Sequence, residues 1–195
     1  MKDLISTALR YRNHRLELLD QHQLPDRELW LHCDSVEAMV AMIRKLQIRG
    51  APLIGIGASL LLAHLAEQGL SEDQLREAAA TLREARPTAV NLMNCLDRML
   101  AVMDQGADAL VACAENLFEE DVALCQRMAE HGAALLPEGA QVLTHCNTGS
   151  LATAGAGTAI GVIAEAFRHG RLSHVWVDET RPLLQGGRLT AWEMC

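Results

Sequence analysis

The stretch Gln141-Val142-Leu143-Thr144-His145-Cys146-Asn147-Thr148-Gly149-Ser150 decides how this 195-residue chain folds. A short apolar run ends in a polar loop, and a segment rich in small residues, Ala152 to His169, follows it. This order is typical of a β-strand, a turn and a helix, the first half of a βαβ unit. In such units ligands bind beyond the carboxyl ends of the strands, near helix N-terminal amides. Cys146 stands at that position, where a helix dipole favours the thiolate, so we expect it to be the chemically active cysteine.

The composition is that of an ordinary globular protein rich in helix. Half of the residues are hydrophobic and 22% are charged, while aromatic residues make up only 3%, so Ala, Leu and Met must fill the core. The formal net charge of −8 argues against a nucleic-acid or membrane partner. The longest apolar run, Pro52 to Leu65, is too short to cross a bilayer. Any anion that the chain binds must therefore be held by a few local arginines.

The six cysteines show no C-x-x-C spacing, and no secretory signal precedes them. We therefore expect reduced thiols and a cytoplasmic protein. Two His-Cys pairs, His32-Cys33 and His145-Cys146, could suggest a metal site. Neighbouring residues on a strand point to opposite faces, so neither pair makes a site by itself, and we expect no metal.

The first part of the chain, residues 1–137, is expected to be one N-terminal domain. Residues 4–33 alternate short apolar runs with polar breaks, which predicts two or three short antiparallel strands. Helices are expected over 36–46, from Pro52 onwards, from the capping box Ser71-Glu72-Asp73-Gln74 to Glu84, over 89–103 and over 108–136.

Two arginines, Arg49 and Arg86, each stand just ahead of an expected helix start. Arg49 followed by the uncovered amides of Gly50 and Ala51 would make a good anion cradle. Spacing alone fits a loop glycine and solvent-exposed arginines at least as well.

The second part, residues 138–195, begins at Pro137-Glu138-Gly139 with a change to a strand–helix–strand pattern. Strands are expected over 141–144 and 174–178, and a further helix from Arg188. The predicted fold class is therefore α/β: a small antiparallel sheet plus a helical N-terminal domain, followed by the first βαβ unit of an incomplete Rossmann-like domain. Two parallel strands with one helix leave open edges, so we expect the front part of a longer protein.

Gly155, Gly157 and Gly161, with Asp178 further on, imitate a dinucleotide-binding fingerprint. The last glycine is one place late, and Gly155 lies about ten residues beyond the strand, whereas the motif requires glycines in the strand-to-helix turn. We therefore expect no nucleotide cofactor.

Four motifs, in this order, resemble the methylthioribose-1-phosphate isomerase family, whose superfamily includes regulatory subunits of the translation-initiation guanine-nucleotide exchange factor. They are Ile48-Arg49-Gly50-Ala51-Pro52, Arg86-Pro87-Thr88-Ala89-Val90-Asn91, Thr144-His145-Cys146-Asn147-Thr148-Gly149 and Asp178-Glu179-Thr180-Arg181-Pro182-Leu183-Leu184-Gln185-Gly186. The resemblance covers essentially the whole chain.

The resemblance implies a cofactor-free aldose–ketose isomerisation in methionine salvage, acting on a small phosphorylated sugar. It implies that Cys146 is catalytic and that Arg49, Gly50, Ala51, Arg86 and Gln185 bind the substrate. It also implies a homodimer formed through the C-terminal domain. The family's acid/base aspartate and a substrate-contacting Asn-Lys pair lie further along than this chain reaches, so we expect little or no activity from these 195 residues alone.

Two alternatives stay open. One is a related sugar-phosphate isomerase, such as one acting on ribose 1,5-bisphosphate, which would differ in the pocket for the C5 substituent. The other is a non-catalytic regulatory or binding subunit on the same scaffold, which would have no use for Arg49, Arg86, Cys146 and Gln185 together.

Overall fold

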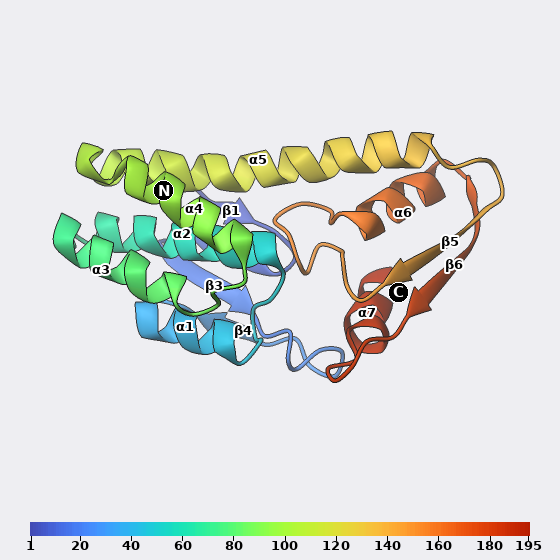
Figure 1. The fold of residues 1–195 in the computed structure, drawn as a ribbon, viewed down its shortest axis with the longest axis horizontal. Coiled ribbons are helices and arrows are strands. Elements are labelled where there is room, and N and C mark those ends of the chain that lie inside the picture. The colour runs from blue at the N-terminus through green and yellow to red at the C-terminus, as the bar shows by residue number, and fades with distance from the viewer.

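The computed structural model describes residues 1–195 and has two connected parts, as Figure 1 shows. The first part contains four strands, β1 (Leu4–Ile5), β2 (Leu9–Arg12), β3 (Arg15–Leu19) and β4 (Trp30–His32), then α1 (Val36–Arg44), α2 (Ala51–Glu67), α3 (Glu72–Arg83), α4 (Val90–Ala101), a 3-10 turn η1 (Met103–Gln105) and α5 (Ala107–Ala134). The second contains β5 (Ala140–His145), α6 (Ala159–Arg168), β6 (Leu172–Asp178), a π-helical turn η2 (Gly186–Thr190) and α7 (Ala191–Met194). The α/β fold class predicted from the sequence is confirmed.

The N-terminal sheet has four strands in the order β1-β2-β3-β4, all antiparallel, where the sequence predicted two or three. The extra strand, β1, is only two residues long and carries little sequence signal. The predicted capping box is present, and α1 has a side-chain cap as well. The Ser35 side chain accepts from the amide of Ala38, and Ser71 and Gln74 form the complete capping box.

Helix α2 is the centre of the core. Every residue from Leu53 to Ala66 is buried, because α2 packs against α3, α4 and α5 and contacts strand β2. A helix that is apolar on all sides is stable only in such surroundings. The core continues without a break into the second part, since Leu151, Ala154 and Leu189 belong to the same buried cluster.

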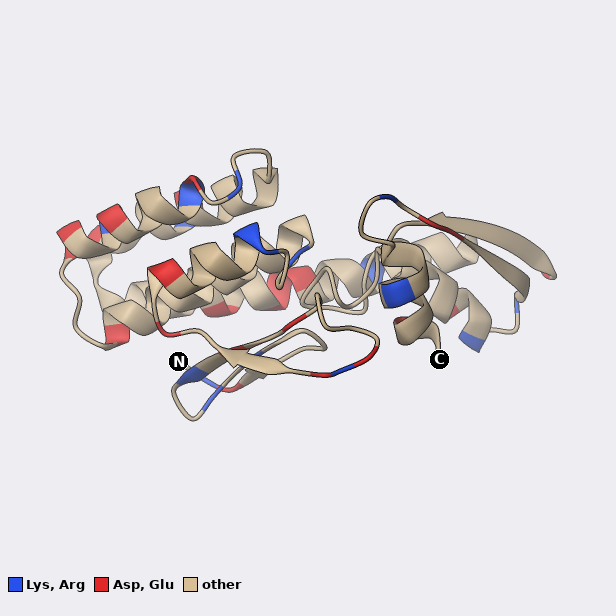
Figure 2. Cartoon of the chain, turned by 90° about the horizontal axis from the view of Figure 1, so that it is seen from below, with Lys and Arg blue, Asp and Glu red and all other residues tan.

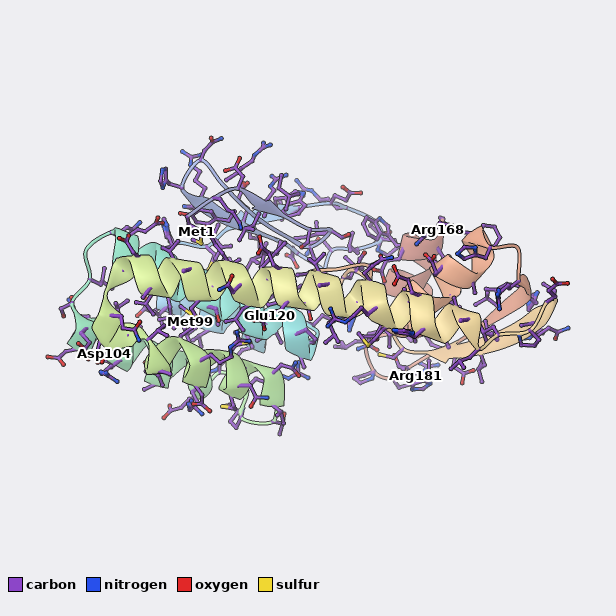
Figure 3. All side chains as sticks on the ribbon, turned by 90° about the horizontal axis from the view of Figure 1, so that it is seen from above. Met1, Met99, Asp104, Glu120, Arg168 and Arg181 are labelled. Atoms are coloured by element: carbon purple, nitrogen blue, oxygen red, sulfur yellow. The ribbon has the colours of Figure 1, made fainter.

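Helix α5 joins the two parts. It runs the length of the molecule, with Asp104 near its beginning and Arg168 and Arg181 beside its far end (Figure 3). Its first half packs on α2 and its second half on α6, which lies between α5 and the two-stranded sheet (Figure 1). The contact with α6 is close, because a Cβ on Gly132 would lie 2.5 Å from a methyl group of Val162.

Strands β5 and β6 pair in parallel, as predicted, with Leu143 opposite Trp176. These two side chains are 64% and 56% exposed, on the face of the sheet turned away from α6. Parallel sheets are normally covered on both faces, so one face of this sheet is bare in the chain as it stands.

The helix predicted over 152–169 begins only at Ala159. Residues 149–157 instead leave the end of β5 and return to it, where Gly149 and Gly157 form an isolated bridge and the amide of Thr158 donates to the carbonyl of Thr148 at 2.8 Å. We call residues 149–157 the docking loop. Its amides bind carboxylates from distant elements, which removes the hydrogen bonds that a helix would need.

The docking loop connects the second part of the chain to the first. The amide of Leu53 donates to the carbonyl of Ala152 at 3.2 Å, and the side chain of Gln21 donates to the carbonyl of Leu151 at 2.7 Å. Gly50 has a φ of +87°, and a Cβ at this position would lie 2.5 Å from the backbone of Ala152. The N-terminal end of α2 therefore meets the loop backbone to backbone.

The last helical segment begins at Gly186, two residues earlier than predicted, and continues through η2 into α7. The guanidinium group of Arg188 fixes it to the first part by donating to the carbonyl of Leu24 at 2.8 Å. No helix of the chain is both long and apolar enough to cross a membrane.

Gly50→Ala should destabilise the chain far more than Gly69→Ala. Both glycines have φ near +90°, but a Cβ on Gly69 would have no other atom within 4 Å, so its substitution tests backbone strain alone. We expect the free energy of unfolding to fall by about 1 kcal/mol for Gly69→Ala and by about 3 kcal/mol for Gly50→Ala, measured by urea denaturation. Equal losses would show that the contact with Ala152 contributes nothing.

Candidate functional site

Arg49 lies just ahead of α2 and reaches across to the end of β5. Its Nη2 atom donates to the backbone carbonyl of Asn147 at 3.3 Å and, in a short contact, to the side-chain oxygen of the same residue. The Nε atom of Arg49 is buried and has no hydrogen-bond partner. No carboxylate pairs with this guanidinium group, so it keeps donor capacity for an anion.

Gly50 and Ala51 place two backbone amides beside Arg49. Neither amide donates a hydrogen bond to any protein group, because Gly50 caps α2 and Ala51 is its first residue. Pro52 follows at the helix start, where its missing N–H leaves nothing unsatisfied. The arrangement predicted from the sequence, an arginine next to free amides at a helix N-terminus, is present.

Arg86 and Arg188 add positive charge near Arg49. Burial lowers the pKa of Arg49, the charges of Cys146 and Glu193 oppose this shift, and the charges of Arg86 and Arg188 lower the pKa further. Arg86 lies just before α4, and its guanidinium group has no hydrogen-bond partner in the protein. The N-terminal ends of α2 and α4 face the docking loop together (Figure 1). Three guanidinium groups, none paired with a carboxylate, therefore lie around the N-terminal end of α2.

Several arginines elsewhere on the surface pair with carboxylates, whereas these three do not. Lys and Arg positions are scattered along the ribbon among a larger number of acidic ones (Figure 2). Most of the salt bridges that the other arginines form, such as Arg98 with Glu120 and Arg76 with Glu72, lie at exposed positions. Unpaired arginines that converge in a chain of net charge −8 are thus a local feature.

Cys146 follows β5 directly and is half-buried. It has a φ of +65°, which is uncommon for a residue with a side chain and recurs at functional sites. The fully buried Thr190 donates from its hydroxyl group to the carbonyl of Cys146 at 2.6 Å, which helps to hold this backbone. The helix expected from Ala152 begins only at Ala159, after the docking loop, yet its N-cap residue Thr158 donates to the carbonyl of Thr148.

Asn147 and Glu193 were not predicted as site residues, although Asn147 lies inside a quoted motif. Asn147 is 4% exposed, and its amide nitrogen donates to the carboxylate of Glu193 and to the hydroxyl of Thr190. No sequence signal marked Glu193, since an acidic residue in a short helix is ordinarily solvent-exposed.

Gln185 lies beyond the carboxyl end of β6, as Cys146 lies beyond that of β5. Its side-chain oxygen accepts from the hydroxyl of Thr180, and its backbone N–H donates to the same hydroxyl at 3.2 Å. The carboxylate of Glu179 accepts from the amides of Gly186 and Gly187, both at 2.9 Å. These contacts fix the turn that carries Gln185 at the same sheet edge as Cys146.

Beside the N-terminal end of α2, a pocket of about 210 Å³ lies between α2, α4 and α5, and Pro52 and Asn91 from two of the quoted motifs line it. Nowhere in the chain do three or more His, Cys, Asp or Glu side chains come together in a way that could hold a metal ion.

Glu179→Gln should weaken the fold in a pH-dependent way. The hydrogen bonds from the amides of Thr180, Gly187 and Gly186 hold the pKa of Glu179 below its ordinary value of 4.5. The stabilisation is therefore fully present above about pH 4.5 and is lost as the pH falls through the lowered pKa. We expect the wild type to resist urea better than Glu179→Gln at pH 7 and the difference to shrink below pH 4.5.

Glu138→Gln is the matched control, because Glu138 is exposed and makes no side-chain hydrogen bond. A wild-type advantage over Glu179→Gln that stays constant down to pH 3 would contradict the assignment.

Comparisons with known proteins agree with the motifs. The chain is 57% identical over 196 residues to a methylthioribose-1-phosphate isomerase of Serratia proteamaculans (strain 568), an alignment that covers all of this chain and 57% of the relative. The chain thus spans little more than half the length of the curated relatives that it matches.

Two solved structures share the fold closely. One is 5-methylthioribose 1-phosphate isomerase from Pyrococcus horikoshii OT3, with a TM-score of 0.88 and 36% identity over 97% of this chain and 57% of that one. The other is the delta subunit of translation initiation factor eIF-2B from A. fulgidus, with a TM-score of 0.80 and 37% identity over 96% of this chain and 58% of that one.

The family resemblance predicted from the four motifs is therefore confirmed. The model of the Initiation factor 2 subunit family matches residues 47–195, from just before Arg49 to the last residue. The chain belongs to the Initiation factor 2 subunit family.

Proposed function

We propose that this chain forms the phosphate-binding and cysteine-bearing part of an isomerase that converts 5-methylthioribose 1-phosphate into 5-methylthioribulose 1-phosphate, a step of methionine salvage. The observation that carries the proposal is the convergence of Arg49, Arg86 and Arg188, without carboxylate partners, at the loop that contains Cys146. The names of the relatives in Serratia and Pyrococcus support the choice of substrate.

The phosphate ester would be held where α2 begins. Arg49 offers a half-buried guanidinium group whose Nε atom is buried, Gly50 and Ala51 offer amides without acceptors, and the helix dipole adds a partial positive charge. Arg86 would bind the same phosphate or a sugar hydroxyl. Charge-assisted hydrogen bonds from two guanidinium groups and the amides of a helix terminus favour the binding of a dianion.

The chemistry sets a constraint that this arrangement meets. Because C1 carries the phosphate, the sugar cannot open through a free anomeric hydroxyl, so the site must assist ring opening and move hydrogen from C2 to C1 without loss of phosphate. This calls for an acid/base pair in a pocket shielded from water. We assign one member to Cys146, which is half-buried beside Arg49, and a substrate-orienting role to Gln185.

We propose that the second member, an aspartate, comes from outside residues 1–195, as the family resemblance implies. On the same basis we propose a homodimer that works in the cytoplasm without a cofactor. All six cysteines are free thiols, which fits a reducing compartment.

The direct test is an activity assay on 5-methylthioribose 1-phosphate with the 195-residue chain and with a chain extended through the coding sequence that follows. We expect turnover only in the extended chain and its loss in Cys146→Ala. Enzyme-like turnover by the 195-residue chain would refute the assignment of the second acid/base group.

A folded, extended chain without activity on this substrate would refute the proposed function. It would favour a related sugar phosphate or a binding role, as the similarity to the A. fulgidus subunit allows. Ribose 1,5-bisphosphate, assayed in parallel, separates these two outcomes.

Cysteine alkylation provides a second test. Burial raises the pKa of the Cys33 thiol to about 12, so at pH 8 roughly one molecule in ten thousand is a thiolate, and the side chain is inaccessible. With iodoacetamide followed by peptide mapping, we expect the exposed Cys195 and the half-buried Cys146 to react before Cys33. Added 5-methylthioribose 1-phosphate should slow the reaction of Cys146 but not that of Cys195, and equal protection of both would contradict the proposed site.

A further inference from the structure

We propose that Glu193 is a positioning residue, which orients Arg49 and the backbone after Cys146 through the amide of Asn147. The inference rests on the proposed function for the identity of the ligand, but its structural part can be tested separately.

The carboxylate of Glu193 is the acceptor around which the end of β5 turns. Its Oε1 atom accepts from the hydroxyl of Ser150 at 2.9 Å and from the amide of Leu151 at 2.7 Å. Its Oε2 atom accepts from the side-chain amide of Asn147 in a short contact. A Cβ on Gly149 would overlap the same carboxylate, so the chain wraps closely around it.

The side-chain amide of Asn147 connects Glu193 to Arg49. Its nitrogen donates to Glu193 and Thr190, and its oxygen accepts from Nη2 of Arg49. The two possible orientations of this side-chain amide are not equivalent. A flipped Asn147 would turn its NH₂ group toward the guanidinium group, which only donates, and its oxygen toward the carboxylate, which only accepts. Glu193 thus selects the orientation in which Asn147 can hold Arg49.

The amide between the two charges matters for binding. A carboxylate in direct contact with Arg49 would neutralise it and compete with the phosphate for the same donors. Through one neutral amide, Glu193 fixes the position of Arg49 and leaves Nε without a protein acceptor. A guanidinium group that is held in place but not neutralised is what a phosphate ester requires.

Thr190 acts from the same helical segment. It lies three residues before Glu193, so both side chains project toward the end of β5, where the Thr190 hydroxyl binds the carbonyl of Cys146 at 2.6 Å. The segment formed by η2 and α7 therefore holds both the cysteine and, through Asn147, the arginine.

The first test is Glu193→Gln, with Glu138→Gln as the control at an exposed position that makes no side-chain hydrogen bond. The new side chain has one acceptor where two are needed, so an NH₂ group faces Asn147 or Leu151. In the 195-residue chain we expect the backbone amide of Leu151 to exchange its hydrogen with solvent faster than in the wild type. We also expect the NMR signal of the Arg49 side chain to change. We expect about ten- to a hundred-fold weaker binding of 5-methylthioribose 1-phosphate by calorimetry.

The second test is the double variant Glu193→Gln/Asn147→Asp, which exchanges the carboxylate and the amide at constant net charge. Hydrogen bonds can form again from Leu151 and Ser150 through residues 193 and 147 to Arg49, and only the bond from residue 147 to the Thr190 hydroxyl is lost, because a carboxylate has no proton to donate. Arg49 now contacts a carboxylate directly. We expect amide exchange at Leu151 to return to the wild-type rate while binding stays weak. A merely structural role for Glu193 predicts that both recover together, and that result would overturn the charge-spacing argument.

The outcomes separate this inference from the proposed function. If Glu193→Gln leaves Leu151 exchange, the Arg49 signal and binding as in the control, the positioning role is wrong. If the wild-type chain binds no 5-methylthioribose 1-phosphate yet Glu193→Gln changes Leu151 exchange and the Arg49 signal, the proposed ligand is wrong and the positioning role stands.

Discussion

The candidate site depends on the contact between the docking loop and the beginning of α2. Gly50 permits it, because the backbone of Ala152 occupies the space where any side chain would lie. The amide of Leu53 then binds the loop, and Leu151 enters the common core. Only with the two parts joined in this way can Arg49, which precedes one helix, reach the residues that follow β5. The packing of a few uncharged groups thus determines where the charged ones meet.

The electrostatics of the site follow from what its arginines bind within the protein. Arg188 donates only to backbone carbonyls, Arg49 donates to Asn147, and Arg86 has no partner. Backbone and amide oxygens fix a guanidinium group in space but leave its net charge intact, whereas a carboxylate would cancel it. In a protein of net charge −8, this choice of acceptors leaves positive charge concentrated around the N-terminal end of α2.

The elements whose signals are local could be predicted from the sequence. The capping box at Ser71, the apolar α2 and the two parallel strands depend on neighbouring residues, and they lie close to where the patterns indicated. The docking loop could not be predicted, because Asp121 and Glu193 bind the amides of Ala154 and Leu151 from distant elements, and those bonds replace the helix that the small residues favour. Glu193 escaped prediction for the same reason, since its role exists only in the folded chain.

The contacts of Arg188 and Glu193 also set an order of assembly. Arg188 binds the carbonyl of Leu24, 164 residues earlier, and Glu193 binds Asn147, 46 residues earlier. Contacts between such distant positions form late, whereas the N-terminal sheet and helices can pack as soon as they leave the ribosome. Until residue 193 has been synthesised, Asn147 has no carboxylate to orient it, and Arg49 has no oriented amide to bind. A nascent chain therefore contains a folded helical core before Arg49 is oriented, and the contacts of the candidate site are complete only once the segment formed by η2 and α7 has been added.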